Sequence, residues 1–342
     1  MADKIEIDQG IGVRYNLSSI TFRRMLNDHI RFMHRYTTKF ENVYLCNILI
    51  NFLHYMYDTD FDGFAADVLK CLKTDNKTEV DKNGKGRLSV TKQLAGRMQA
   101  LVDRIQKIKK IEVAFFEKSK VISYIFDRFA AMSFHEREKI YFYDIYYELN
   151  DYINKSQMIR LRYYPKENYG NSEPKIYEVK PYDILLDDNS FSYYLIGYAK
   201  ENGKSDYMIC SFKLSRIISC EYLPDTSFIG KKEKYSLEKV IAKYGPAYTQ
   251  DSENQNEIVV RLSQKGYELF LTSIARQRPI PIAEPKPDNE KTGFYKLKFD
   301  CSYSQIRNYF FSYGGEAEVL SPTELRERFI NDYSKALNQY SL

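Results

Sequence analysis

Hydrophobic and polar residues alternate with a period of two along four short segments in the middle of the chain. The segments are MIRLRYY at 158–164, KIYEVKP at 175–181, SYYLIGY at 192–198 and DYMICSFKLSRI at 206–217. Such alternation is typical of strands that bury one face and expose the other. The pattern therefore predicts several consecutive strands that form a small β-barrel.

The outward faces of these strands carry cations and tyrosines. In the first strand, Arg160, Arg162 and Tyr164 alternate with apolar residues and are expected to face solvent. Lysine and arginine hold phosphates while bases stack on aromatic rings, so the combination favours a single-stranded nucleic acid as ligand. The alternative is a structural barrel whose tyrosines and Arg216 only brace the sheet. The candidate binding residues are Arg160, Arg162, Tyr164, Tyr193, Tyr194, Lys213 and Arg216.

The N-terminal region has the pattern of one strand followed by two helices. Residues 12–17 alternate so that the apolar side chains face the core and Arg14 and Asn16 face outward. A serine pair then caps one helix, and Asn42 caps a second. Arginine and asparagine suit base edges, which favours contact with nucleic acid. The alternative is a module that only dimerises the protein, with Arg14 as a solvated charge.

A polar segment and a basic helix follow this region. Residues 74–87 (TDNKTEVDKNGKGR) are hydrophilic and punctuated by glycine, which predicts a linker. From Ser89 to about residue 110 the spacing of apolar residues predicts an amphipathic helix. Residues 81–120 contain eleven Lys or Arg against four Asp or Glu. This excess favours either phosphate contact or the ordinary charged outer face of such a helix.

The last third of the chain alternates strand and helix patterns. From residue 258 the expected order is strand, helix, short strand, strand, helix, strand and a final helix. This order predicts a split βαβ, ferredoxin-like module. Upstream of the barrel, Ser133 and Glu136 have the spacing of a capping box at the start of a helix.

Length and composition restrict the class of protein but do not indicate an activity. A chain of 342 residues is expected to hold two or three domains, and a net charge of +5 permits nucleic-acid binding without indicating it. Five cysteines without a CxxC pair indicate reduced thiols, and no apolar run reaches the length of a membrane span. We therefore expect a cytoplasmic protein without membrane contact.

Candidate catalytic and metal sites are weak. Residues 58–63 imitate the start of an EF-hand loop, but Leu69 stands where a bidentate Glu is required. The segment Gly84–Arg87 lacks the spacing of a phosphate loop, and the four histidines form no metal motif. We therefore expect no catalytic residue, no metal and no cofactor, and hence a protein that is not an enzyme.

The barrel segments also resemble a known family. Arg160-x-Arg-Tyr, then Glu178-Val-Lys-Pro, then Tyr193-Tyr-Leu, then Phe212-Lys-Leu-Ser-Arg-Ile follow the order of a WYL domain. The resemblance implies a small SH3/Sm-like β-barrel. Tyr193 stands where the family has Trp, and Lys213 and Ser215 stand where it usually has Arg and Asp. These departures concern the ligand pocket of the family rather than its fold.

Two further resemblances complete the predicted architecture. The strand–helix–helix order of 11–57 resembles a ribbon-helix-helix domain, which implies pairing of strands from two chains in a homodimer. The segment 313–327 (YGGEAEVLSPTELRE) resembles the extension that follows many WYL barrels. The fold class is therefore α+β and multidomain. The expected domains are a ribbon-helix-helix-like module (1–73), a helical connector (74–154), a WYL β-barrel (155–230) and a ferredoxin-like C-terminal module (231–342).

This combination is similar to the WYL-containing accessory proteins of type VI, RNA-targeting CRISPR systems. That similarity implies binding of single-stranded RNA and stimulation of an effector nuclease that cleaves RNA. The alternative is a DNA-binding transcriptional regulator of WYL type. A variant of that alternative senses a nucleotide ligand through its barrel.

Overall fold

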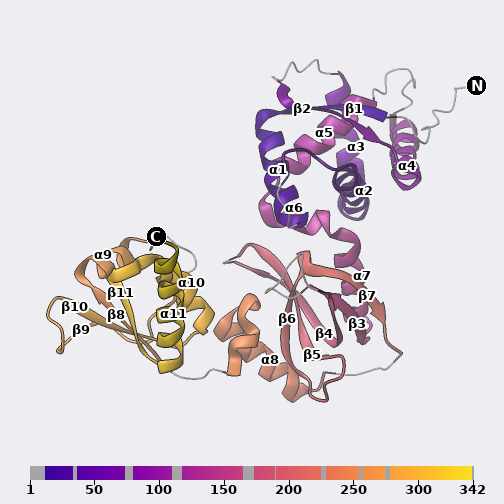
Figure 1. The fold of residues 1–342 in the computed structure, drawn as a ribbon. Coiled ribbons are helices and arrows are strands. Elements are labelled where there is room, and N and C mark those ends of the chain that lie inside the picture. The colour runs from indigo at the N-terminus through magenta and orange to yellow at the C-terminus, as the bar shows by residue number, and fades with distance from the viewer. Residues whose placement is uncertain are drawn as a thin grey trace, which may run out of the picture. The chain divides into compact units, whose positions relative to one another are not determined.

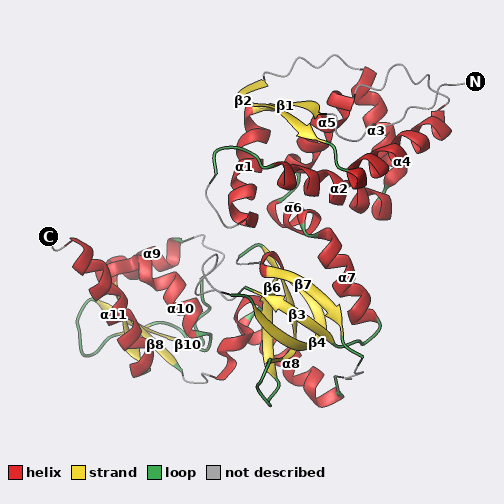
Figure 2. Cartoon of the chain, turned by 45° about the vertical axis from the view of Figure 1, so that its right-hand side comes forward, coloured by secondary structure: helices red, strands yellow, loops and turns green. Residues whose placement is uncertain are grey.

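The protein is a mixed α and β protein whose described strands form three sheets (Figures 1 and 2). The chain divides into two compact units, the first comprising Met1–Lys155, Arg160–Ile176 and Leu214–Glu221, and the second Ser156–Ile159, Tyr177–Lys213 and Tyr222–Leu342. The computed structural model describes residues 12–33, 37–73, 80–109, 118–164, 173–188, 190–224, 229–253, 257–273 and 278–340.

Helices and a two-stranded ribbon make up the N-terminal module, residues 12–154 of the first unit. Its hydrophobic core is continuous from Tyr15 to Tyr141 and is rich in aromatic rings. Buried residues from Leu88 to Met98 and from Val121 to Tyr141 therefore pack in one core with buried residues between Tyr15 and Leu69. The elements are β1 (Gly12–Ser18), α1 (Ser19–Met33), α2 (Asn42–Thr59), α3 (Phe61–Lys73), β2 (Val80–Ser89), α4 (Lys92–Lys109), α5 (Lys118–Ala131), α6 (Phe134–Tyr141) and α7 (Tyr143–Asn154).

Strands β1 and β2 form an antiparallel ribbon within this chain, with Tyr15 opposite Gly86. The prediction that residues 80–87 belong to a linker is therefore wrong. The other edge of β1 lies against α5, where the Asn16 backbone N–H donates to Ser123 Oγ at 3.0 Å. Both edges of β1 thus have partners in the same chain, so a second chain is not required to pair this strand.

Two of the three predicted helix N-caps are present in the structure. Ser18 Oγ accepts a backbone hydrogen bond in the first turn of α1, and Ser133 and Glu136 form the predicted capping box at α6. Asn42 differs from its predicted role as a cap. Its Nδ2 donates to the Ser89 carbonyl at 3.3 Å and its Oδ1 accepts from the Ser89 N–H at 2.8 Å. Asn42 therefore fixes the end of β2 beside the start of α2.

The middle of the chain forms a five-stranded sheet with the strand order β6-β5-β4-β3-β7. The strand predicted over 206–217 is interrupted, because residues 214–216 form a short 3₁₀ helix between β6 and β7. The elements are β3 (Ile159–Tyr163), β4 (Lys175–Asp187), β5 (Ser192–Glu201), β6 (Met208–Lys213), η3 (Leu214–Arg216) and β7 (Ile217–Tyr222).

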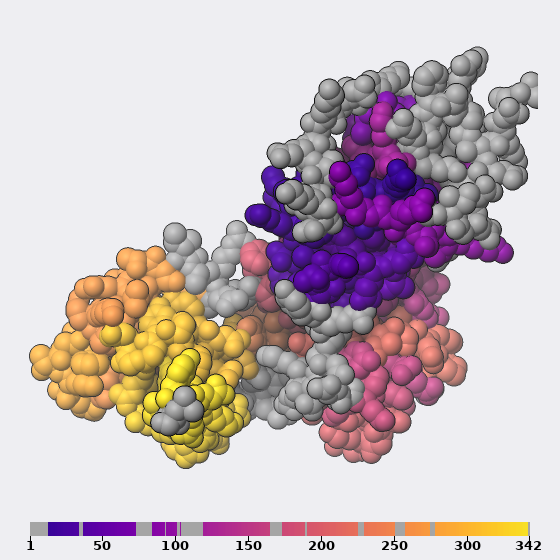
Figure 3. All heavy atoms as spheres, turned by 45° about the horizontal axis from the view of Figure 1, so that its top comes forward, coloured from indigo at the N-terminus to yellow at the C-terminus, as the bar shows by residue number. Residues whose placement is uncertain are grey.

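The C-terminal part of the second unit has a four-stranded antiparallel sheet with the order β11-β8-β10-β9. Buried side chains of α9, α10 and α11 cover one face of this sheet. The end of α11 lies at the surface of this part (Figure 3, bright yellow). The elements are α8 (Lys231–Tyr244), η4 (Pro246–Glu253), β8 (Ile258–Ser263), α9 (Gln264–Thr272), β9 (Lys286–Pro287), β10 (Phe294–Phe299), α10 (Tyr303–Phe310), η5 (Phe311–Glu316), β11 (Ala317–Ser321) and α11 (Thr323–Tyr340).

Candidate nucleic-acid interface

The outward face of the β1–β2 ribbon carries three cations and one amide. Arg14 lies opposite Arg87, and Asn16 lies opposite Lys85, in the antiparallel register. All four side chains are exposed, whereas the inward-facing Tyr15 is 7% exposed. The predicted alternation of β1 is thus confirmed, and β2 adds two cations to the predicted pair. We call these four residues the ribbon face.

The cations of the ribbon face have no acidic partner within the described part of the chain. Among the side chains that the structure describes, no carboxylate forms an ion pair with Arg14, Lys85 or Arg87. Like charges directly opposite each other on neighbouring strands repel, so the Arg14–Arg87 pair gains stability from an anion bound between its members. Phosphate is such an anion, and arginine binds it through charge-assisted hydrogen bonds.

Sequence reasoning missed Lys85 and Arg87, because their segment was interpreted as a linker. A usable signal was present, since the cations alternate with Gly84 and Gly86, which take the inward positions. Gly86 is required there by a close approach. A Cβ atom at this position would lie 2.2 Å from the hydroxyl oxygen of Tyr15, so only glycine lets the ribbon close over that ring.

Strand β3 confirms the predicted alternation of the barrel. Its apolar residues are buried, and Arg160 and Arg162 are exposed between them. Tyr164 follows directly after the strand and is half-buried. Its backbone N–H donates to the carbonyl of Arg216 at 3.1 Å, which ties the end of β3 to η3. Two guanidinium groups therefore lie on one face of β3, and a half-buried tyrosine follows the end of the strand.

The remaining barrel candidates differ from the expected exposed set. Tyr193, Tyr194 and Lys213 are half-buried, and each interacts with a neighbour. Tyr194 lies opposite Lys213 in the β5–β6 register, and its hydroxyl accepts a hydrogen bond from Ser190 Oγ at 3.4 Å. These contacts favour the alternative in which the tyrosines brace the sheet.

Arg216 is part of η3 rather than of a strand. Its side chain is half-buried, and its Nε atom is buried without a hydrogen-bond partner. The residue lines a pocket of about 290 Å³ within the first unit. Arg216 therefore has a different environment from the outward-facing Arg160 and Arg162.

The predicted basic helix is α4, which begins at Lys92 because Ser89 ends β2. Arg97 Nη1 donates to the carbonyl of Ile50 at 3.4 Å, so this cation makes a contact inside the N-terminal module. Outside the described side chains lie Arg104, Lys107, Lys109 and Lys110.

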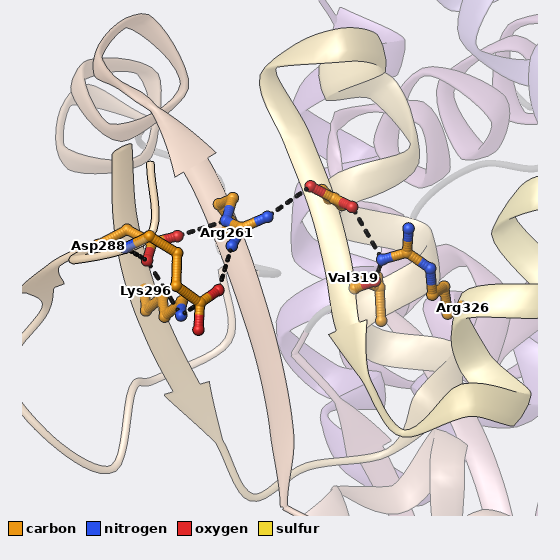
Figure 4. Close-up of polar contacts among 7 residues, drawn as sticks. Arg261, Asp288, Lys296, Val319 and Arg326 are labelled. Carbon is orange, nitrogen blue, oxygen red and sulfur yellow. Dashed lines mark hydrogen bonds and ion pairs between the residues drawn. The ribbon is translucent and has the colours of Figure 1, made fainter. Parts of the chain in front are cut away.

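The C-terminal sheet shows the opposite electrostatic arrangement on the face opposite its buried core (Figure 4). Arg261 on β8 donates to Asp288, to Glu290 at 2.9 Å and to Glu318 at 3.2 Å. Lys296 Nζ lies 3.0 Å from both Asp288 and Glu290. Three carboxylates thus surround two cations at the centre of this face.

Arg326 of α11 extends the same network. Its Nη1 lies 2.8 Å from Glu318 and 3.0 Å from the carbonyl of Val319 (Figure 4). The cations of this face are therefore matched by carboxylates. A matched set of charges offers little attraction to phosphate, so this face differs from the ribbon face.

Asp288 makes the stability of this network dependent on pH. Burial alone raises the pKa of Asp288, but hydrogen bonds from the Glu290 N–H, Lys296 and Arg261 lower it to about 2. Since an unfolded Asp has a pKa of about 3.9, the carboxylate stabilises the fold above that value and loses this effect as the pH falls towards 2.

We therefore expect Asp288→Asn to melt below wild type at pH 7, with a gap that narrows below about pH 4 and closes near pH 2. Thermal unfolding across this pH range measures the gap. Asp206→Asn, at an exposed aspartate outside the network, is the control and is expected to show no such gap. A gap for Asp288→Asn that stays constant with pH would contradict the prediction.

The structure gives no support to the weaker candidate sites. Asp60 Oδ1 accepts a hydrogen bond from the Gly63 N–H at 3.0 Å, so it caps α3. Within the described residues, no group of three or more His, Cys, Asp or Glu side chains is placed to hold a metal ion. Burial raises the pKa of Cys210 to about 11, and burial together with Asp300 raises that of Cys301 to about 12. Both thiols are therefore protonated at neutral pH, unlike a nucleophilic thiolate.

Of the helices in the described residues, none combines the length and the apolar character needed to cross a bilayer.

Two segments of the chain match known domain families. The WYL domain family matches residues 144–222, and the WCX domain family matches residues 257–337. The chain therefore contains a WYL domain followed by a WCX domain. The resemblance to a WYL domain that the barrel segments predicted is confirmed.

Solved structures provide a second comparison. A protein described as "Crystal structure of a CRISPR Cas-related protein" is similar over 99% of this chain and 96% of that chain, with a TM-score of 0.72 and 18% identity. This likeness shows a shared fold over nearly the whole chain. Proteasome accessory factor B/C of Arthrobacter aurescens aligns with 99% of this chain and 52% of that chain at 14% identity. Its TM-score of 0.28 is too low to support an argument. No curated protein matches the sequence.

Proposed function

We propose that this protein binds single-stranded RNA and acts as a non-catalytic accessory of an RNA-guided nuclease that cleaves RNA. The ribbon face carries the proposal, because its three exposed cations have no acidic partner among the described side chains. Such a face attracts the phosphates of a polyanion. The WYL and WCX domains support a regulatory protein that binds nucleic acid.

Strand β3 favours a single strand over a duplex. Arg160 and Arg162 are exposed next to Tyr164, whose ring is partly accessible. Unpaired bases stack on aromatic rings while neighbouring cations hold the backbone. The accessory role draws on the shared fold with a CRISPR Cas-related protein.

A DNA-binding transcriptional regulator is the second candidate. The major groove of B-form DNA admits a two-stranded antiparallel ribbon, and β1 and β2 form such a ribbon with Arg14 and Asn16 on its outward face. This candidate includes regulators that also sense a nucleotide.

Three structural proposals accompany the function. The order of β1, α1 and α2 supports a ribbon-helix-helix-like module in which β2 takes the place of a second chain's strand. The strand order β11-β8-β10-β9 supports a ferredoxin-like C-terminal module. The homodimer that the ribbon-helix-helix resemblance implies is a further proposal, but it would not form by pairing of β1 strands, because β1 has partners within its own chain. Light scattering of the purified protein tests whether a homodimer forms.

Binding across a salt series tests the choice between RNA and DNA. We expect random single-stranded RNA to bind more tightly than duplex DNA of equal length. Three phosphate contacts on the ribbon face should give a slope of log K against log salt of about −2 or steeper. A preference for duplex DNA would instead establish the second candidate. An RNA-guided nuclease gene beside a repeat array in the same genome is the expected sign of the accessory role.

A further inference from the structure

The pocket lined by Arg216 has the composition of a ligand site. It lies within the first unit, and its lining comes from α1, α2, the α6–α7 junction, η3, β7 and Tyr164, which follows β3. Aromatic rings form part of its wall. Phe32 stacks with Tyr141 at 5.0 Å between ring centroids and packs edge-on against Phe142 at 5.6 Å. Apolar and aromatic walls with a few polar groups are typical of small-molecule sites.

Three residues of this lining, Asn51, Ser215 and Arg216, each carry a buried polar atom that has no hydrogen-bond partner among the described residues. Asn51 is 6% exposed, and its Nδ2 donates to the carbonyl of Tyr141 at 2.7 Å, but its Oδ1 accepts no hydrogen bond. Ser215 is 5% exposed, and its hydroxyl is unpaired, as is the buried Nε of Arg216. A buried polar group without a partner destabilises the fold, so such groups in one pocket call for a ligand or for ordered water.

The chemistry of these atoms narrows the ligand class. Asn51 Oδ1 requires a hydrogen-bond donor, Arg216 Nε requires an acceptor, and Ser215 Oγ suits either. A volume of about 290 Å³ is at the lower limit for ligand sites. A flat ring with donors and acceptors on one edge, placed against aromatic walls, satisfies these requirements together.

We infer that this pocket binds one nucleobase. The base comes either from an unstacked nucleotide of bound RNA or from a free nucleotide. Only the first source rests on the proposed RNA binding. In both cases the Watson–Crick or Hoogsteen edge of the base meets Asn51, Ser215 and Arg216, in the way that proteins read unpaired bases. This role explains why Arg216 differs from Arg160 and Arg162, which face solvent.

A pocket-filling variant and a matched control test the inference. Ile218 on β7 lines the pocket and is 37% exposed, so Ile218→Trp is expected to obstruct the pocket while leaving the core intact. Met208 on β6 is 52% exposed and does not line the pocket, so Met208→Trp is its control. Ser215→Ala removes an unpaired hydroxyl, and its melting temperature without ligand is expected to equal or exceed that of wild type.

Two measurements separate the sources of the base. For a free nucleotide, AMP, GMP, CMP or UMP raises the melting temperature of wild type and Met208→Trp but not of Ile218→Trp or Ser215→Ala. For a base of RNA, wild type binds a single-stranded oligonucleotide at least tenfold more tightly than an abasic oligonucleotide of equal length. This preference is lost in Ile218→Trp and retained in Met208→Trp.

The outcomes also separate this inference from the proposed function. If no nucleotide shifts the melting temperature and Ile218→Trp keeps the wild-type preference for bases, the pocket holds water only and the inference is wrong. RNA binding on its own then stands. If the protein binds no RNA but nucleotides stabilise it through the pocket, the proposed function fails and the inference stands.

Discussion

Replacing Arg14, Lys85 and Arg87 together with glutamine is expected to weaken binding of single-stranded RNA by roughly 100-fold at 0.1 M salt. Each phosphate contact with a single strand contributes about 0.7 to the slope of log K against log salt, so three lost contacts remove about 2. These side chains are exposed on the outward face of the ribbon, and the fold is expected to survive their replacement. Filter binding over a salt series measures both the affinity and the slope.

A charge-matched variant separates the ribbon face from net charge. Lys231, Lys232 and Lys239 are exposed on α8, and changing them to glutamine removes the same three charges. We expect this control to bind RNA nearly as wild type does. An equal loss in both variants would mean that only overall charge matters. Unchanged affinity in the ribbon variant would move the phosphate contacts to Arg160 and Arg162.

Local patterns predicted the faces of individual strands. In β1 and β3, side chains alternate strictly, and the two faces differ enough in polarity that Arg14 and Arg160 are outward in any sheet that buries the apolar face. The capping box at Ser133 was predictable for the same reason, since donor and acceptor are three residues apart. Predictions succeeded where the deciding contacts are close in sequence.

Contacts between distant residues decided the other outcomes. The segment containing Lys85 and Arg87 is a strand because it pairs with β1 and because Gly86 leaves room for Tyr15. Asn42 has a good cap residue type, yet its amide binds the backbone of Ser89, 47 residues away. Propensity and turn chemistry describe the local chain and contain no information about such partners.

The same limit applies to the functional meaning of a charge. Arg261 on β8 alternates with buried apolar residues just as Arg160 does on β3. In the structure, Arg261 is held by carboxylates that include Asp288, 27 residues away, whereas Arg160 is exposed. A cation on a strand is therefore a candidate for phosphate binding only after its acidic neighbours are known. By this criterion the ribbon face is a candidate for phosphate binding and the outward face of the C-terminal sheet is not.

Breaking the buried ion pair between α1 and α6 is expected to cause the largest loss of stability. Asp28 is 1% exposed and Arg137 is 8% exposed, and the guanidinium binds both carboxylate oxygens, with Nη2–Oδ1 at 3.2 Å. Asp28→Asn leaves Arg137 buried without its counter-charge, which costs about 3–5 kcal/mol. The free energy of unfolding of the full chain in urea measures this loss.

A double variant distinguishes the unpaired charge from lost packing. Asp28→Leu combined with Arg137→Met removes both charges and keeps apolar volume, so it is expected to recover most of the stability that Asp28→Asn loses. Lys155→Met is the control, because it removes an exposed ion pair in which Lys155 is 58% exposed and Asp151 is 46% exposed. This change should lower the free energy of unfolding by less than about 1 kcal/mol. If the double variant is as unstable as Asp28→Asn, the hydrogen bonds of the pair itself stabilise the junction of α1 and α6. The loss of stability in Asp28→Asn would then not come from a buried, unpaired Arg137.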